Sequence, residues 1–133
     1  MDRKDLQALS KIRLIEAKAL LRLGHYDGAY YLAGYAVECA LKACIAKETR
    51  RHEFPDKKRV NESHTHILKD LVKLARLEDS YLDRLRTDKT FRDNWEVVQF
   101  WSEQSRYRRS RPEDAQEILQ AANGVIAWIK LHW

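Results

Sequence analysis

Glycine, proline and cysteine are scarce in this sequence. Its 133 residues include four glycines, two prolines and two cysteines. Because glycine and proline end helices and form turns, their scarcity beside abundant Leu, Ala, Lys, Arg and Glu predicts an all-helical protein. Two cysteines exclude a disulfide framework, and Cys39 and Cys44 lie on one predicted helix, where they point in different directions. We interpret both as buried thiols in a reducing compartment.

The chain also lacks the features of export and of membrane insertion. Its first residues, MDRKDLQALSKIR, are charged from the second position and contain no apolar h-region. We therefore expect no secretory signal and a cytoplasmic location. The most apolar stretch, residues 29–46, approaches the length of a membrane span at about 18 residues. Glu38 and Lys42 in its middle and the net charge of +5 argue against a membrane location.

Residues 27–47, DGAYYLAGYAVECALKACIAK, organise the rest of the chain. A helix that is apolar around most of its circumference is normally buried among neighbours, and small side chains let another backbone come close. We predict that this segment is the central helix of a bundle. At helical spacing it resolves into a small stripe (Ala29, Ala33, Ala36, Ala40, Ala43), a bulkier stripe (Tyr30, Gly34, Val37, Leu41, Cys44) and a third stripe (Tyr31, Tyr35, Glu38, Lys42, Ile45).

Four further helices follow from hydrophobic periodicity and from turn residues. They span residues 3–23, residues 64–85 with a possible break near 78–80, residues 87–104, and residues 110–129. Residues 49–63 are densely charged, lack an apolar period and form the one predicted loop. The length is that of a single domain, residues 1–133, and the predicted class is all-α.

The ends and faces of these helices are predicted too. Gly24 ends the first helix and Asp27 is placed to cap the second, so the short connection makes the two helices antiparallel neighbours. Ser63 or Thr65 is the predicted cap of the third helix, and Ser110 with Glu113 forms a predicted capping box for the last. The predicted core-facing positions are Leu9, Ile12, Ile15, Ala19 and Leu23 in the first helix and Phe91, Trp95 and Val98 in the fourth.

Glu38 is the first candidate for chemistry, because a carboxylate on an otherwise apolar helix must be paired, hydrogen-bonded or protonated. Lys42, one turn further on, offers an ion pair within the helix. Arg106, which follows the fourth helix, offers a bidentate contact from another element. If Lys42 is the partner, the ion pair is structural. If Arg106 is the partner, Tyr31, Tyr35, Glu38 and Lys42 line a ligand-binding cleft.

A run of basic residues around one tyrosine is the second candidate. Its members are Arg106, Tyr107, Arg108, Arg109 and Arg111. Cations with an aromatic ring among them hold phosphates and stack a base. The alternative is a solvated basic turn, partly neutralised by Glu113 and Asp114. The net charge of +5 permits binding to a polyanion without establishing it.

Histidines form the third candidate. His64 and His66 lie two residues apart with His52 nearby, but no acidic or thiolate ligand stands at the spacing of a metal site. We therefore expect no metal and no cofactor, and we expect His66 to be packed or hydrogen-bonded. The sequence also lacks a glycine-rich phosphate loop, a nucleophile elbow and a zinc-protease helix.

Residues 30–43, YYLAGYAVECALKA, resemble the signature helix of HEPN domains, small prokaryotic helical bundles also found inside larger eukaryotic chains. Residues 66–71 (HILKDL), residues 106–107 (RY) and residues 112–115 (PEDA) are similar to further pieces of that family, in the same order. The resemblance implies an antiparallel up-and-down bundle of four to five helices, often a dimer and frequently encoded beside or fused to a minimal nucleotidyltransferase. Some such pairs are toxin and antitoxin.

The resemblance also implies what a catalytic member needs. Active ribonucleases of the family carry an arginine followed by four to six residues and a histidine, and cleave RNA without metal. The histidine promotes attack by the 2′-hydroxyl and the arginine steadies the phosphate. Here the fifth residue after Arg92 is Val97, and no histidine follows until His132. Arg59 and His64 satisfy the spacing, but they lie across the charged loop and the start of the third helix.

Three functions therefore stay open: a binding module, a ribonuclease and a structural dimer. The ribonuclease would be a metal-independent toxin that uses Arg59 with His64 or His66. The structural dimer would have an interface made of aromatic residues of the second or fourth helix. We expect a homodimer and no membrane partner. The favoured function is a HEPN-type module without its own catalysis that binds a nucleotide, RNA or a nucleotidyltransferase partner through Tyr31, Tyr35, Glu38, Lys42, Arg106, Tyr107, Arg108 and Arg109.

Overall fold

A computed structural model describes residues 1–51 and 61–133, with the side chains of 1–49 and 61–133. The predicted all-α fold is confirmed, and the described residues contain no strand. None of the described helices is both long and apolar enough to cross a membrane. The helices are α1 (Arg3–Arg22), α2 (Tyr26–Arg51), α4 (Leu68–Leu74), α5 (Glu78–Thr87), α6 (Lys89–Val98), the 3₁₀ helix η1 (Glu103–Tyr107) and α7 (Pro112–Ile129).

Part of the predicted loop lies outside the described residues. This concerns His52 and Arg59, and with Arg59 the arginine-to-histidine spacing that ends at His64. The first residues of the predicted loop are helical instead, because α2 continues through Thr49 to Arg51.

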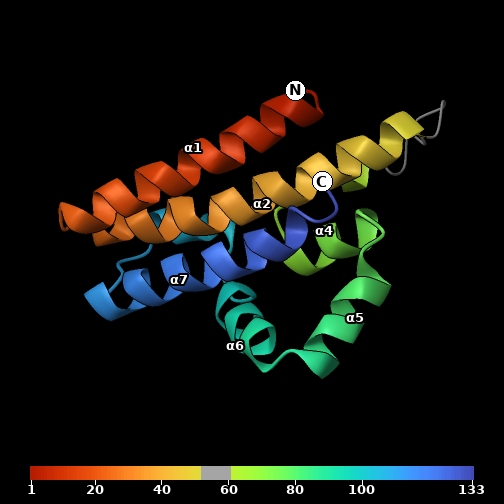
Figure 1. Cartoon of the computed structure of the whole chain (residues 1–133). Coiled ribbons are helices and arrows are strands. Elements are labelled where there is room, and N and C mark those ends of the chain that lie inside the picture. The colour runs from red at the N-terminus through yellow and green to blue at the C-terminus, as the bar shows by residue number, and fades with distance from the viewer. Residues whose placement is uncertain (52–60) are drawn as a thin grey trace.

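The long helices α1, α2 and α7 lie side by side, with α6 packed on α7 and α4 packed on α2 (Figure 1). α5 lies between α4 and α6 in the chain, and its Ser80 hydroxyl accepts a hydrogen bond from the indole N–H of Trp128 on α7 at 3.1 Å. α1 and α2 run in opposite directions, as their short connection predicts. α7 runs in the same direction as α2, because the backbone N–H of Ser110 bonds Asp27 at the start of α2 while Lys47 near its end bonds the carbonyl of His132. This pair departs from the up-and-down order expected for the bundle, since the elements between α2 and α7 return the chain to the start of α2.

α2 is the central helix, as predicted. The alanines of its small stripe are fully buried, and so are Val37 and Leu41 of the bulkier stripe. The packing of α1 explains why small side chains are needed there: the Ser10 hydroxyl donates a hydrogen bond to the backbone carbonyl of Ala36 at 2.8 Å. Such a bond requires the two helix backbones to approach closely, which bulky residues on α2 would prevent.

The predicted buried face of α1 is wrong. Leu6, Ser10 and Ala17 are the buried positions, whereas Ile12 and Leu23 are exposed and Ile15 has 64% of its surface exposed. α1 carries two apolar stripes, and hydrophobicity alone favours the one with the isoleucines. The stripe that faces α2 is the one whose small side chains fit the alanine stripe, so shape complementarity outweighs residue hydrophobicity at this contact.

From this burial we predict that replacing the polar Ser10 by alanine destabilises the protein more than replacing the apolar Ile15, the opposite of what residue hydrophobicity suggests. Ser10→Ala removes a buried interhelical hydrogen bond and is expected to lower the free energy of unfolding by about 1 kcal/mol. Ile15→Ala removes an exposed side chain and is expected to change it by about 0.5 kcal/mol or less. Urea unfolding followed by circular dichroism measures both. A larger loss for Ile15→Ala would mean that the isoleucine stripe is buried in solution.

The predicted third helix is two helices. α4 ends at Leu74 and α5 begins at Glu78, close to the expected break, and Arg76 between them has a positive φ of 58°. The start of the helix is wrong, because α4 begins only at Leu68 and has Ile67 rather than Ser63 or Thr65 at its N-cap. The Thr65 hydroxyl instead accepts a hydrogen bond from the Ile67 N–H at 3.2 Å. His66 therefore lies in non-helical chain before the helix.

The predicted fourth helix is also divided. Phe91, Trp95 and Val98 are buried on α6 as expected, but the helix ends at Val98. The chain then turns so that Trp101 is buried against α2, and η1 follows. η1 thus reaches the third stripe of α2, which a continuous helix over residues 87–104 would not do.

Two predicted caps are wrong. α7 has Arg111 at its N-cap, with Asp114 completing the capping box, so Ser110 and Glu113 do not form it. Asp27 lies in the first turn of α2 rather than at its cap, because α2 begins at Tyr26. Its carboxylate accepts the backbone N–H of Ser110 at 2.6 Å, which joins the starts of α2 and α7.

Candidate functional site

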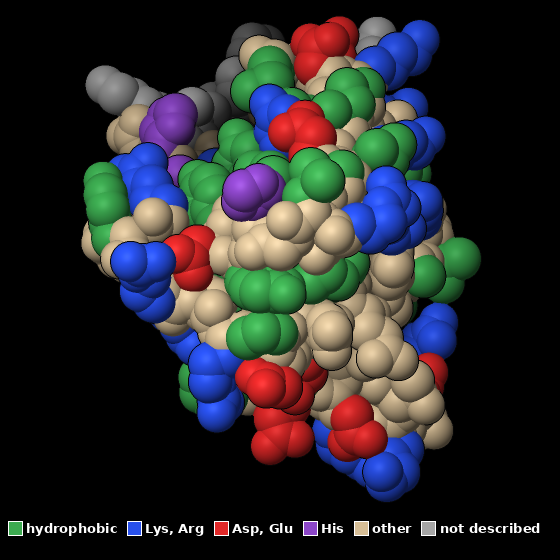
Figure 2. All heavy atoms as spheres, turned by 90° about the vertical axis from the view of Figure 1, so that its left-hand side faces the viewer, with side chains coloured by type: hydrophobic (Ala, Val, Ile, Leu, Met, Phe, Trp, Pro, Cys, Tyr) green, Lys and Arg blue, Asp and Glu red, His purple; other side chains and the backbone are tan. Residues whose placement is uncertain are grey.

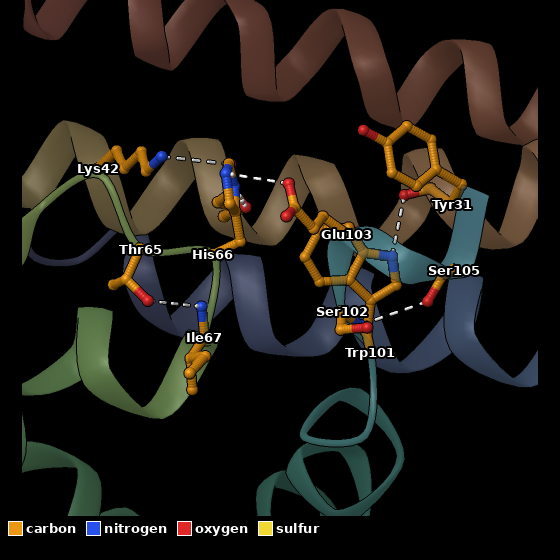
Figure 3. Close-up of polar contacts among 10 residues, drawn as sticks. Tyr31, Lys42, Thr65, His66, Ile67, Trp101, Ser102, Glu103 and Ser105 are labelled. Carbon is orange, nitrogen blue, oxygen red and sulfur yellow. Dashed lines mark hydrogen bonds and ion pairs between the residues drawn. The ribbon is translucent and has the colours of Figure 1, made fainter. Parts of the chain in front are cut away.

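Three elements meet at the ring of His66. Its Nδ1 lies 2.8 Å from Oε1 of Glu38 on α2, and its Nε2 lies 3.1 Å from Oε2 of Glu103 on η1 (Figure 3). Because both ring nitrogens face carboxylate oxygens, both contacts are hydrogen bonds only when each nitrogen carries a proton. The imidazole therefore joins a central helix, a non-helical segment and a 3₁₀ helix at one point.

Glu38 is the buried member of this group. Only 2% of its surface is exposed, against 41% of the His66 side chain, and its second oxygen lies 3.4 Å from Nζ of Lys42. A buried carboxylate is costly unless it is paired and hydrogen-bonded. Here the two oxygens are divided between a histidine and a lysine, so the charge is compensated at both. The predicted Glu38–Lys42 pair is confirmed.

The predicted contact between Glu38 and Arg106 is wrong. Within the described residues Glu38 pairs with Lys42 and His66, while Arg106 is exposed and stacks on the ring of Tyr107 at 5.0 Å. η1 does approach Glu38, but it presents Glu103 to the site instead of an arginine. The prediction that His66 is hydrogen-bonded is confirmed.

Aromatic rings border the site along the third stripe. Tyr31 stacks on Tyr35 with centroids 6.0 Å apart, and the ring of Trp101 lies 5.9 Å from that of Tyr31 (Figure 3). The Trp101 indole N–H donates a hydrogen bond to the Tyr31 carbonyl at 3.1 Å. Burial raises the pKa of Tyr35 to about 12, so its phenol stays protonated at neutral pH. Sequence reasoning assigned Tyr31 and Tyr35 to the site but missed Trp101 and Glu103.

The two cysteines are buried free thiols, as predicted. Burial raises the pKa of Cys39 to about 11 and that of Cys44 to about 12. Because the thiolate is the nucleophile and a thiol with such a pKa is protonated at neutral pH, neither cysteine is activated.

The basic run is divided between paired and exposed side chains. Arg111 is held by two contacts of 3.1 Å to Asp114, and Arg108 lies over the Tyr30 ring at 4.8 Å. These two arginines fasten the turn to the start of α7 and to α2. Arg109 projects into solvent, with Asp27 at 3.9 Å, and Arg106 with Tyr107 forms an exposed cation–aromatic pair.

The remaining candidates lie elsewhere. His64 is exposed, and no group of three metal-ligating side chains occurs in residues 1–49 and 61–133. The guanidinium of Arg92 donates to the backbone carbonyl of Leu85 at 2.8 Å, so it supports the end of α5. His132 contacts the hydroxyl of Ser80 at 3.3 Å, and burial lowers its pKa.

Fold and site together define an all-α bundle whose central helix carries a buried glutamate, held by a histidine from the segment before α4. The sequence model of the HEPN domain matches residues 7–132, nearly the whole chain. This chain belongs to the HEPN domain family, and the resemblance of residues 30–43 is confirmed. Searches of curated proteins and of solved structures return no significant match.

Proposed function

We propose that this chain is a HEPN module that binds single-stranded RNA, or a nucleotide, without ribonuclease chemistry of its own. The observation that carries the proposal is the exposed pair of Arg106 and Tyr107 on η1, whose guanidinium and ring lie 5.0 Å apart. An aromatic ring in water offers a face on which a base stacks, and an adjacent guanidinium holds the phosphate of that nucleotide.

The surroundings of this pair support the same ligand. Arg109 is exposed close by, so a second phosphate along a strand meets a second cation. The total charge is weaker support, because basic and acidic side chains are interspersed with apolar ones on the face seen in Figure 2. Binding at this turn is therefore attributed to the geometry of its side chains and not to the net charge of +5.

The position of η1 is well supported by the fold. Its first residue, Glu103, bonds His66, and Ser102 and Ser105 bond each other across its first turn. A rigid platform loses less conformational entropy when it binds a flexible strand. In this proposal Arg106, Tyr107 and Arg109 contact the ligand. Glu38 and Lys42 do not contact it, and their role is to hold His66, which in turn holds η1 in place.

Binding of a labelled single-stranded oligoribonucleotide, followed by fluorescence anisotropy, tests the proposal. Tyr107→Ala is expected to weaken binding at least about fivefold, since stacking of one base on an aromatic ring contributes about 1–3 kcal/mol. Arg106→Gln is expected to weaken binding and to reduce the slope of log K against log salt by about 0.7, the value for one lost phosphate contact on a single strand.

The chain offers matched controls for both variants. Phe100 has the same exposed fraction as Tyr107, 74%, and Arg86 is an exposed arginine on α5. Phe100→Ala and Arg86→Gln are expected to leave the affinity unchanged. Equal losses in all four variants would point to non-specific attraction, and no measurable binding by the unaltered chain would reject the proposal.

One observation favours ribonuclease activity as a second candidate. His66 lies between two carboxylates and its side chain is 41% exposed, so it is accessible for proton transfer. Incubation of the purified chain with RNA in the presence of a chelator separates the two functions. Cleavage that His66→Ala abolishes and His64→Ala spares would establish His66 as the catalytic residue and reject the binding-only proposal.

The partner and the oligomeric state are part of the proposal through the family alone. We infer that a minimal nucleotidyltransferase and a second copy of the chain are the partners to test first. Of the aromatic residues expected at a dimer interface, Tyr30, Trp95 and Trp101 are buried within the single chain, whereas Phe100 is 74% exposed and is available for such a contact. Mass measured by light scattering at several concentrations, with and without such a partner, tests both expectations.

A further inference from the structure

A cavity of about 470 Å³ lies beside the site, between the start of α1 and the last turns of α2. Its volume is within the range of sites that hold small molecules. None of its lining residues belongs to η1, so it is separate from the surface proposed to bind RNA. Its lining includes Arg3 and Leu6 of α1, Lys42, Ile45 and Ala46 of α2, and His64.

The inner part of this cavity is apolar. Leu6 and Ile45 are both buried, and Ala46 beside them leaves space because its side chain is small. The Thr49 hydroxyl adds no free hydrogen-bond donor, because its proton is donated to the carbonyl of Ile45 at 3.0 Å. A surface of this kind favours a small hydrocarbon or aromatic body.

The rim of the cavity carries positively charged side chains that have unused hydrogen-bond donors. The Arg3 guanidinium forms no ion pair with any described residue. Lys42 is paired with one oxygen of Glu38, whose other oxygen contacts His66. Because an ammonium has three donors, Lys42 has donors left for a ligand. The imidazole of His64 adds a further donor. Asp2 is the opposing charge, and its carboxylate already accepts the backbone N–H of Asp5 at 2.9 Å.

We propose that this cavity is a binding site for a small anion with an apolar or aromatic body, a phosphate monoester or a carboxylate. The body lies on Leu6, Ile45 and Ala46, and the head group accepts hydrogen bonds from Arg3 and Lys42. Lys42 is oriented by the buried Glu38, which fixes the ammonium at the boundary between the apolar surface and the rim.

Titration of the ¹⁵N-labelled full chain with phenyl phosphate, followed by amide chemical shifts, tests the proposal. Saturable shifts are expected at amides around the cavity, including those of Leu6, Ala46 and Thr49. Benzoate tests the carboxylate head and benzyl alcohol the body without charge. Binding of either anion but not of the alcohol supports the proposal and identifies the head group, and equal binding by the alcohol overturns anion recognition.

Three variants locate the site. Arg3→Gln is expected to weaken binding on the order of tenfold, the effect of one lost charged hydrogen bond. Ala46→Phe fills the cavity and is expected to abolish binding, with a thermal melt showing that the chain is folded. Lys11→Gln, on the same helix as Arg3 but outside the cavity, is expected to have no effect. If Ala46→Phe does not fold, Arg3→Gln and Lys11→Gln decide the question.

The outcomes are distinct from those for RNA. Tyr107→Ala is expected to leave the phenyl phosphate titration unchanged. Loss of phenyl phosphate binding in Tyr107→Ala would place the anion on η1 and overturn the cavity site. Amide shifts that rise linearly with ligand concentration, without saturation, would show non-specific attraction and overturn the cavity site. Equal reduction of the shifts by Arg3→Gln and Lys11→Gln would do the same. Failure of RNA binding has no bearing on these results.

Discussion

Adding a single methyl group at Gly34 is expected to destabilise this protein by about 3 kcal/mol. A Cβ at this position would lie 2.1 Å from Cδ1 and 2.2 Å from Cγ of Trp101. Trp101 is buried and its indole N–H is bonded to the Tyr31 carbonyl, so the rigid ring cannot move aside without losing that bond. Gly34→Ala is expected to displace the chain between α6 and η1 and, with it, the contact of Glu103 with His66.

A matched control lies on the same helix. The nearest atom to a Cβ at Gly28 is the end of the flexible Leu20 side chain, at 3.0 Å. Gly28→Ala is therefore expected to be nearly neutral, since alanine favours a helix over glycine by about 1 kcal/mol and this gain offsets the crowding. Thermal and urea unfolding compare the two variants. Equal stability of both would show that Trp101 does not pack on α2 as described.

Removal of the Glu38 carboxylate is the second large effect we expect. Glu38→Ala leaves the donors of His66 and Lys42 without their acceptor and opens a cavity beside α2, and breaking a buried ion pair in this way costs about 3–5 kcal/mol. The lower end applies here, because His66 and Lys42 are partly exposed and water replaces part of the lost bonding. Glu38→Gln keeps the volume and one acceptor, so we expect a smaller loss.

A double-mutant cycle isolates the contact between Glu38 and His66. The free energies of unfolding of Glu38→Gln, His66→Ala and the double variant give a coupling energy, expected at about 1–2 kcal/mol for residues in one hydrogen-bonded group. Glu38→Gln with Arg86→Gln, a distant pair, is the additive control. Additivity of Glu38 and His66 would contradict a direct hydrogen bond and would remove the support proposed for η1.

Sequence reasoning was most successful where a pattern left one choice. α2 is apolar on nearly every side, so it had to be central whichever neighbour covered each face. Phe91, Trp95 and Val98 form a single stripe on α6, and they are buried as predicted. The same reasoning failed on α1, where two apolar stripes competed and the fit of Ser10 and Ala17 to the alanines of α2 decided between them.

Composition and periodicity by themselves determined the all-α class, the central place of α2 and the need for Glu38 to be paired, because each follows from contacts within one helix or from the cost of burying a charge. Only the tertiary structure decided that the partners are His66 and Lys42, with Glu103 on the far side of the ring. His66 and Glu103 are distant from Glu38 in the chain, and they come together because α4 begins late and α6 ends early. No local pattern specifies those two ends, since packing against α2 selects them.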